Sequence, residues 1–384
     1  MELIARDRRH TDCLKWDKEP GPLQMWVADM EFETLPAVTQ ALVDRAKQGI
    51  FGYGIEPEGY RAAVCSWMQR RHDWTISEDS IVPAPGNVAA LKLLIQTLTQ
   101  PGDRILVQKP VYYMFDQAAL SNGRQIVSSD LVCKDGRYSI DLADFERVMT
   151  EQHVKLFILC NPHNPVGRVY TKQELKAIGE ICRRRDVFVI SDEVHADFIL
   201  EGKHVPFPMA SPECEMQCAV LTGPNKTFNL AGLKCANVIL ANPEIRERFR
   251  NQLDACGVLS QNIFSLLACK VAYQQGGEYV EALCRKLREN DRLLRQHAAQ
   301  ILPQVQAIRL EGTYLLWLDV STLGLHGEAL HRFLLEKAKL HVDEGEMFGS
   351  AGEGFIRLNL ACDAQQVTDA IDRIARAAKE EKLI

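Results

Sequence analysis

The sequence of 384 residues has no excess of positive charge: 45 Lys and Arg stand against 51 Asp and Glu, a net charge of −6. Proteins that bind a phosphate backbone or an anionic membrane usually carry a basic face. Neither nucleic acid nor a membrane is therefore expected as a partner. The longest basic run, Arg183 to Arg185, falls at the end of an expected helix, where cations complement the helix dipole, so we interpret it as structural.

Long apolar runs are also missing. No stretch approaches the length that a membrane-spanning helix needs, and the first residues, MELIARDR, contain no apolar signal core. The twelve cysteines are scattered and include no Cys-x-x-Cys, which predicts a cytoplasmic protein with reduced thiols. Cys214, Cys218, His195 and His204 match no common zinc spacing, so no metal is expected.

Several enzyme motifs are absent as well. The sequence has no Gly-x-Gly-x-x-Gly after an expected strand, no P-loop and no Gly-x-Ser-x-Gly. This argues against dinucleotide-binding, P-loop and α/β-hydrolase enzymes. The composition, 46% hydrophobic and 25% charged, is nevertheless that of an ordinary globular protein.

Between about residues 75 and 240, short apolar runs alternate with amphipathic helices. This alternation is typical of an α/β fold, in which helices cover both faces of a mostly parallel sheet. Residues 155–160 and 187–190 are expected to form buried strands. A helix is expected to begin just after Gly86.

The character of the sequence changes after about residue 280, where an α+β region is expected. Its predicted elements are a long charged helix over 279–300, strands over 313–320 and 355–359, and a terminal helix from about 364. Residues 1–45 show no such alternation and are expected to cross over and join this region. We therefore expect a large domain of residues 46–280 and a small domain made of residues 1–45 and 281–384.

Polar side chains follow three apolar runs of the expected sheet: Asn164, Asp192 and Lys226. Ligands of open α/β sheets bind at the carboxyl ends of strands. Pyridoxal phosphate needs an amine that holds it as a Schiff base, a carboxylate beside its ring nitrogen and a donor to its ring hydroxyl. Alone, Lys226 could be solvated and Asp192 could cap a turn. Together the three residues favour pyridoxal phosphate.

Four segments carry a family resemblance: NPHNPVGRVYTKQEL (161–175), SDEVHADF (191–198), NKTFNLAGLK (225–234) and GFIRLNLAC (354–362). In order and spacing they resemble the fold type I pyridoxal-phosphate enzymes of the class I/II aminotransferase superfamily. Further segments, including WVADMEF (26–32) and EGTYLLWLD (311–319), resemble its branch of PatB/MalY-type cystathionine β-lyases and cysteine desulfhydrases. The resemblance implies the fold type I architecture, a large α/β domain with a smaller α+β domain made from both chain ends.

The resemblance also implies roles for individual residues. Lys226 would be the Schiff-base lysine and would move the proton of the substrate α-carbon. Asp192 would pair with the pyridinium nitrogen, and Asn164 would bind the ring hydroxyl. Arg357 would grip the α-carboxylate of an amino-acid substrate, which suits its planar guanidinium.

Four more residues receive roles from the same resemblance. Tyr112 would stack on the cofactor ring and take part in catalysis, and His195 would support the cofactor. Ala28, like Asn164, would lie on the substrate side. Tyr53 would reach the phosphate of the neighbouring subunit, which implies a homodimer.

A phosphate site is expected at the start of the helix that follows Gly86, because the free N–H groups and positive dipole end of a helix attract anions. Gly86, Asn87 and Val88 would form it. The sequence departs from its relatives at Asn87, Asn225 and Lys234, which we still assign to the cofactor. Thr222 would take over part of the phosphate contact.

The reaction expected from this resemblance is a carbon–sulfur β-elimination on L-cystathionine or L-cysteine, which yields a thiol or sulfide, pyruvate and ammonia. The alternative is an aminotransferase, because Lys226 serves both reactions. An additional regulatory binding role is a third hypothesis. The motifs alone do not separate the first two.

Overall fold

The computed structural model describes residues 1–258 and 260–384, and its largest sheet has seven strands. Across the sheet they are β2 (Ile81–Ala84), β10 (Ala236–Ile239), β9 (Cys218–Thr222), β8 (Phe188–Asp192), β7 (Leu156–Cys160), β3 (Arg104–Val107) and β4 (Gln125–Ser128). β10 runs antiparallel to both of its neighbours, whereas the other neighbouring pairs are parallel. The prediction of a mostly parallel sheet is confirmed.

Side chains of the central strands alternate between two hydrophobic cores. In β7, Phe157 and Leu159 enter one core, and Ile158 between them enters the other. The first core includes side chains of α3 (Tyr60–His72), α6 (Leu142–Glu151), α7 (Lys172–Arg184) and α11 (Ser265–Gln275). The second includes side chains of α4 (Asn87–Leu98), α5 (Met114–Leu120) and α10 (Pro243–Ala255). Helices on both faces explain why the strands are apolar throughout.

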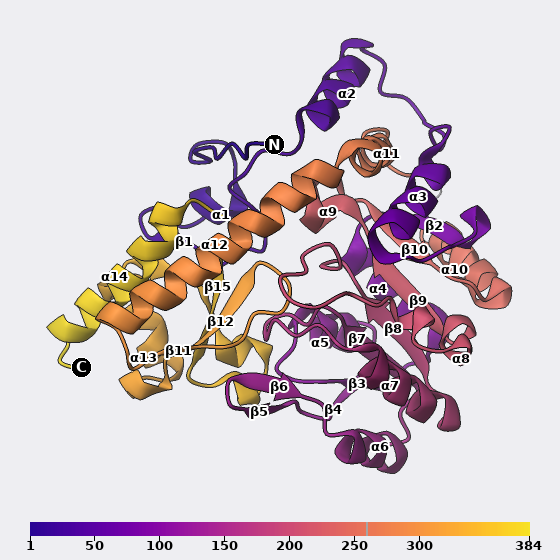
Figure 1. Ribbon diagram of the computed structural model, residues 1–384. Helices are drawn as coiled ribbons and strands as arrows, with labels where there is room; N and C mark the ends of the chain where they lie inside the picture. The colour runs from indigo at the N-terminus through magenta and orange to yellow at the C-terminus, as the bar shows by residue number, and fades with distance from the viewer. Residues whose placement is uncertain (259) are drawn as a thin grey trace.

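A second, antiparallel sheet has the order β11 (Gln306–Ala307), β12 (Leu315–Asp319), β15 (Phe355–Asn359) and β14 (Asp343–Glu344). The long helix α12 (Gly277–Ile301) packs along the terminal helix α14 (Ala364–Glu380), as Figure 1 shows in orange and yellow. The predicted strand over 313–320 is shorter in the structure. Thr313 has φ +71°, a left-handed conformation that interrupts the extended backbone before Leu315.

The N-terminal segment lies against the C-terminal part of the chain. β1 (Leu23–Gln24) pairs in parallel with β13 (Leu340–His341). The other N-terminal elements are α1 (Leu14–Asp17) and α2 (Pro36–Lys47), and α2 packs against α11. Residues near both ends of the chain therefore meet beside the second sheet.

Short elements complete the fold: the hairpin β5 (Val132–Lys134) and β6 (Arg137–Ser139), and the helices α8 (Pro212–Met216), α9 (Pro224–Thr227) and α13 (Gly327–Arg332). Within the basic run, Arg184 and Arg185 both pair with Glu146 on α6, which supports its structural interpretation. Of the helices that the structure describes, none combines the length and the apolar character needed to cross a membrane.

Candidate functional site

A cavity of about 440 Å³ lies at the carboxyl ends of the central strands. Most residues predicted for the site line it, namely Ala28, Gly86, Asn87, Val88, Tyr112, Asn164, Asp192, His195, Asn225, Lys226 and Lys234. Residues that the sequence analysis did not single out also line it, among them Ala89, Phe115, Cys160, Val194 and Ala231. Three predicted residues, Tyr53, Thr222 and Arg357, do not belong to this lining and are described below.

Lys226 lies on α9, a one-turn helix that follows β9 directly. Its Nζ donates a hydrogen bond of 2.6 Å to the carbonyl oxygen of Ala28. The next residue, Thr227, anchors this turn, because its hydroxyl donates to the buried carboxylate of Asp197 at 2.7 Å. Burial, assisted by the positive charge of Arg357, lowers the pKa of Lys226 to about 8. A substantial fraction of this amine is therefore neutral at mildly alkaline pH.

Asp192 is the last residue of β8, directly opposite Cys160 of β7 in the parallel register. This strand is longer than predicted, because its pairing continues through Ser191 and Asp192. One carboxylate oxygen accepts from the backbone N–H of Val194 at 3.2 Å. Burial raises the pKa of Asp192 to about 6. The side chain is thus a buried carboxylate that is still ionised at pH 7, which favours a cationic neighbour.

The start of α4 forms a cradle for an anion. Gly86 caps the helix with φ +95°, a backbone conformation that residues with a Cβ rarely adopt. Space alone would allow a Cβ at this position, because its nearest neighbour, Lys234 Cα, would be 3.7 Å away. The side-chain nitrogen of Asn225 donates to Asn87 Oδ1 at 3.1 Å. This leaves Asn87 Nδ2 and Asn225 Oδ1 buried without a hydrogen-bond partner among the described residues. Free helix N–H groups and an unpaired amide donor suit a phosphate group.

Thr222 ends β9 and pairs with Asn237 of β10 across the sheet. It is buried outside the residues that line the cavity. Lys234 does line the cavity, and its left-handed backbone, with φ +55°, brings it close to Gly86.

Arg357 lies at the centre of β15, and its side chain is only 3% exposed. Nη1 donates to Asn164 Oδ1 at 3.0 Å, and Nη2 donates to the carbonyl oxygen of Trp26 at 2.8 Å. Nη2 also contacts the carboxylate of Asp343, its register partner on β14. The guanidinium lies 4.9 Å from the centre of the Phe348 ring. Arg357 therefore adjoins the cavity through Asn164, which lines it.

Tyr112 and His195 both line the cavity, and Tyr112 is half-buried whereas His195 is buried. The backbone N–H of Tyr112 donates to the carbonyl oxygen of Asn164 at 3.1 Å, and burial raises the pKa of its phenol. Burial also lowers the pKa of His195 well below its usual value, so that its ring is neutral at pH 7. His195 Nδ1 has no hydrogen-bond partner in the part of the chain that the structure describes. The ring packs edge-on at 5.4 Å against Tyr314.

The segment of residues 25–30, which bends at 27–29, passes beside Lys226 and lines the cavity with Ala28. The Met25 carbonyl accepts from the backbone N–H of Asn359 on β15, and the carbonyl groups that follow accept from side chains. Trp26 accepts from Arg357, and Ala28 accepts from both Lys226 and Tyr314, the latter at 2.8 Å. Asn359 donates through its side chain to the carbonyl groups of Val27 and Asp29.

Asp343 and Tyr314 are contacts that the sequence reasoning did not identify. Asp343 belongs to a two-residue strand, which is too short to show a recognisable alternation of polar and apolar residues. Tyr314 stands in the EGTYLLWLD segment, but nothing in that segment indicates that its hydroxyl reaches Ala28. Across residues 1–258 and 260–384, no cluster of three or more His, Cys, Asp or Glu side chains could hold a metal ion.

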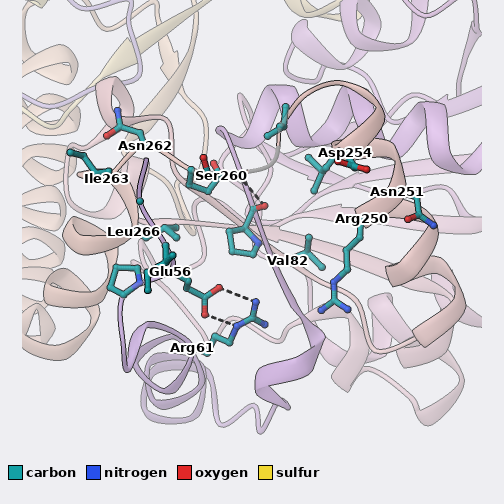
Figure 2. Close-up of a pocket in the computed structure, with 17 residues that line it drawn as sticks. Glu56, Arg61, Val82, Arg250, Asn251, Asp254, Ser260, Asn262, Ile263 and Leu266 are labelled. Carbon is teal, nitrogen blue, oxygen red and sulfur yellow. Dashed lines mark hydrogen bonds and ion pairs between the residues drawn. The ribbon is translucent and has the colours of Figure 1, made fainter. Parts of the chain in front are cut away.

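A second cavity, of about 590 Å³, lies away from these residues and is shown in Figure 2. Glu56 and Arg61 form an ion pair of 2.6 Å beside it, and the segment 260–263 also lines it. The neighbouring residues Phe51, Tyr53 and Ile55 are exposed to solvent. This region combines a hollow with exposed large hydrophobic side chains.

Comparison with known proteins places the whole chain in one family. A family model described as aminotransferase class I and II matches residues 23–374. The curated protein cystathionine beta-lyase PatB of Bacillus subtilis is 39% identical over 385 residues, which cover 98% of this chain and 100% of PatB.

Two solved structures are similar over nearly their full length. The structure of cystalysin from Treponema denticola, which contains pyridoxal 5′-phosphate, has a TM-score of 0.94 at 33% identity and covers 98% of each chain. That of a PLP-bound C-S lyase from Staphylococcus hominis has a TM-score of 0.92 at 30% identity and covers 97% of each chain. The chain therefore belongs to the aminotransferase class I and II family.

Proposed function

We propose that this protein is a pyridoxal-phosphate-dependent carbon–sulfur β-lyase. Its substrate would be L-cystathionine, L-cysteine or both. The observation that carries this proposal is the position of Lys226, a half-buried amine with a lowered pKa that donates to the Ala28 carbonyl and lines the same cavity as the buried carboxylate of Asp192. The similarity to cystathionine beta-lyase PatB over the full chain supports the choice of a lyase.

The residues of the cavity fit pyridoxal phosphate. The N-terminus of α4 and the unpaired Asn87 Nδ2 would hold its phosphate, with Asn225, Lys234 and, less directly, Thr222 beside them. When bound, the cofactor supplies an electron-withdrawing ring that stabilises negative charge at the α-carbon of an amino acid.

The other side chains of the cavity would act on the cofactor ring. Asp192 would face its cationic nitrogen, and Asn164 would bind its hydroxyl through Nδ2, because Oδ1 already accepts from Arg357. Tyr112 would cover the ring, and the neutral His195 would support it. Lys226 would attach the cofactor until the substrate arrives.

The chain's own residues would then carry the proton and hold the substrate. Lys226 Nζ, once free and neutral, would take the proton from the substrate α-carbon. Arg357 would hold the α-carboxylate. Loss of the thiolate from the β-carbon, followed by hydrolysis, converts L-cystathionine and water into homocysteine, pyruvate and ammonia. With L-cysteine the products would be sulfide, pyruvate and ammonia.

The aminotransferase alternative is tested with the same substrate. The purified, cofactor-loaded protein is incubated with L-cystathionine, and pyruvate is measured with and without an added keto acid. We expect one pyruvate for each L-cystathionine consumed without any keto acid. Turnover that needs the keto acid and releases negligible pyruvate would contradict the lyase and favour an aminotransferase.

We also propose a homodimer in which Tyr53 reaches the phosphate cradle of the partner subunit. The exposed side chains of Phe51, Tyr53 and Ile55 beside the second cavity support this, because solvent exposure of such side chains is unfavourable in a monomer. Light scattering should give a dimer mass for the active protein. The Tyr53→Phe variant should remain dimeric but lose cofactor more readily, and an active monomer would contradict the proposal.

Two further proposals concern organisation and location. The division into residues 46–280 and residues 1–45 with 281–384 is supported by the two sheets, whose strands lie within 81–239 and 306–359. A cytoplasmic location is supported by the twelve cysteines, which are all free and mostly buried.

A further inference from the structure

The donors of Arg357 are already in use. A guanidinium has five N–H groups, and both of those on Nη2 are taken, one by the Trp26 carbonyl and one by the carboxylate of Asp343. One N–H of Nη1 donates to Asn164. The N–H of Nε is buried, and no described residue accepts from it.

This arrangement conflicts with a two-point grip on a carboxylate. Each fork of a guanidinium, Nε with Nη2 or Nη1 with Nη2, includes Nη2. Nε and Nη1 cannot hold a carboxylate together, because Cδ occupies the edge of the guanidinium between them. A substrate carboxylate can therefore be held by a fork of Arg357 only when one of the two acceptors on Nη2 leaves.

Of those two acceptors, the Trp26 carbonyl is fixed. It belongs to the backbone, and its neighbours are held on both sides, since Asn359 donates through its backbone N–H to Met25 and through its side chain to Val27. Asp343, in contrast, reaches Arg357 with a side chain that can rotate about its own bonds. Its carboxylate is also the group that would repel a second carboxylate on the same guanidinium.

Asp343 is not needed to orient Arg357. The guanidinium is placed by Asn164 and Trp26, lies over the Phe348 ring, and projects from a strand that pairs with β12 along its length. Burial raises the pKa of Asp343, which agrees with a carboxylate whose charge is poorly solvated even beside Arg357.

We propose that Asp343 is a specificity-determining residue that occupies the carboxylate site of Arg357 and competes with the α-carboxylate of the substrate. The inference rests on the proposed function, in which Arg357 binds that carboxylate. The free energy needed to displace Asp343 from Arg357 then lowers the affinity of the site for amino acids. It also disfavours ligands whose carboxylate binds Arg357 at a single point, because these cannot displace it.

The test compares two ligands that differ only in the carboxylate. L-Alanine has no leaving group on its β-carbon, and L-alaninamide lacks the negative charge. Dissociation constants of both are measured from the visible absorbance of the cofactor-loaded protein, for the natural protein and for Asp343→Asn, which keeps the shape and removes the charge. We expect the preference for L-alanine over L-alaninamide to rise by about tenfold in Asp343→Asn.

The matched control is Glu344→Gln, which removes a negative charge one residue further along β14. Glu344 pairs with His331 rather than Arg357, so the preference should stay unchanged. An equal rise in both variants would overturn the proposal in favour of a general charge effect. An unchanged or lower preference in Asp343→Asn would also overturn it, because Asp343 would then be a support of Arg357.

A structure of the natural protein with L-alanine provides the second measurement, which does not depend on a variant that folds. The contact between Asp343 and Arg357 Nη2 should be broken in it. A carboxylate held by two N–H groups of Arg357 with the Asp343 contact intact would overturn the proposal. Both measurements are independent of pyruvate release, so failure of the lyase assignment would be recognised separately.

Discussion

The N-terminus of α4 and the guanidinium of Arg357 both attract anions, but the protein supplies an anion to only one of them. Around α4, Asn87 and Asn225 bond to each other and leave a buried donor and a buried acceptor unpaired. Around Arg357, three acceptors from the chain itself bind the guanidinium, including the carboxylate of Asp343. Unpaired buried polar atoms cost free energy, so the first region favours permanent occupation, as by a resident cofactor. The second suits a group that comes and goes, because Asp343 satisfies Arg357 between substrates.

The largest effect is expected at Lys226, which lines the same cavity as the start of α4. Lys226→Ala removes the amine that we propose attaches the cofactor and moves the α-proton, so pyruvate release should fall by roughly 10³-fold or more. The visible absorbance that is bleached by borohydride should disappear as well. Lys270→Ala, at a half-exposed position of α11 that does not line the cavity, is the control and should keep both. A Lys226→Ala protein that still bound the cofactor in borohydride-reducible form would disprove the assignment.

A smaller loss is expected when the guanidinium is replaced by an ammonium. Arg357→Lys keeps the charge but loses the planar fork, so the affinity for L-alanine should fall by about 1–3 kcal/mol, roughly tenfold to a hundredfold. The exposed Arg309, which pairs with Glu201, provides the control Arg309→Lys. Affinity that stays the same in Arg357→Lys would show that another group binds the carboxylate.

Replacing Gly86 tests whether the start of α4 binds the phosphate of the cofactor. Gly86→Ala forces a left-handed φ of +95° on a residue with a Cβ, at a cost of about 1–2 kcal/mol. If the strain moves the helix N-terminus, the dissociation constant of pyridoxal phosphate should rise by about tenfold. Gly102→Ala imposes a similar strain, at φ +89°, in a turn with open space around it. Both variants should lower the thermal unfolding temperature, but equal cofactor affinities in the two would contradict a special role of Gly86.

The smallest effect concerns pH. The lowered pKa of Lys226, about 8 instead of 10.5, means that its neutral fraction grows as the pH rises through 8. The neutral amine is the reactive form, so the rate at which cofactor-free protein takes up pyridoxal phosphate should increase by about fivefold from pH 7 to pH 8 and then level off. A rate that keeps rising above pH 10 would show an amine with an ordinary pKa.

Site residues that come directly after strands were predicted from the sequence better than contacts made between separate segments of the chain. Lys226, Asp192 and Asn164 follow three apolar runs, and a parallel sheet brings the ends of such runs to one edge, where the cavity lies. The order of the elements and the mostly parallel sheet were predictable for the same reason, since each depends on local periodicity.

The contacts to Arg357 were not predictable in this way. Asp343 reaches Arg357 because two short strands pair, and such pairing across the sheet has no periodicity to reveal it. The hydrogen bond from Lys226 to Ala28 uses a backbone carbonyl, which every residue possesses. The identity of residue 28 therefore gives no indication that its carbonyl oxygen accepts a hydrogen bond from Lys226. Three-dimensional structure was required to place both.

The backbone of residues 25–30 limits how this site can change during evolution or engineering. The acceptors at Trp26 and Ala28 are peptide groups, so replacing those side chains leaves the acceptor atoms in the chain. An alanine scan of the segment would report little about them. Side chains of the segment can therefore change while the backbone acceptors that hold Lys226 and Arg357 in place are kept.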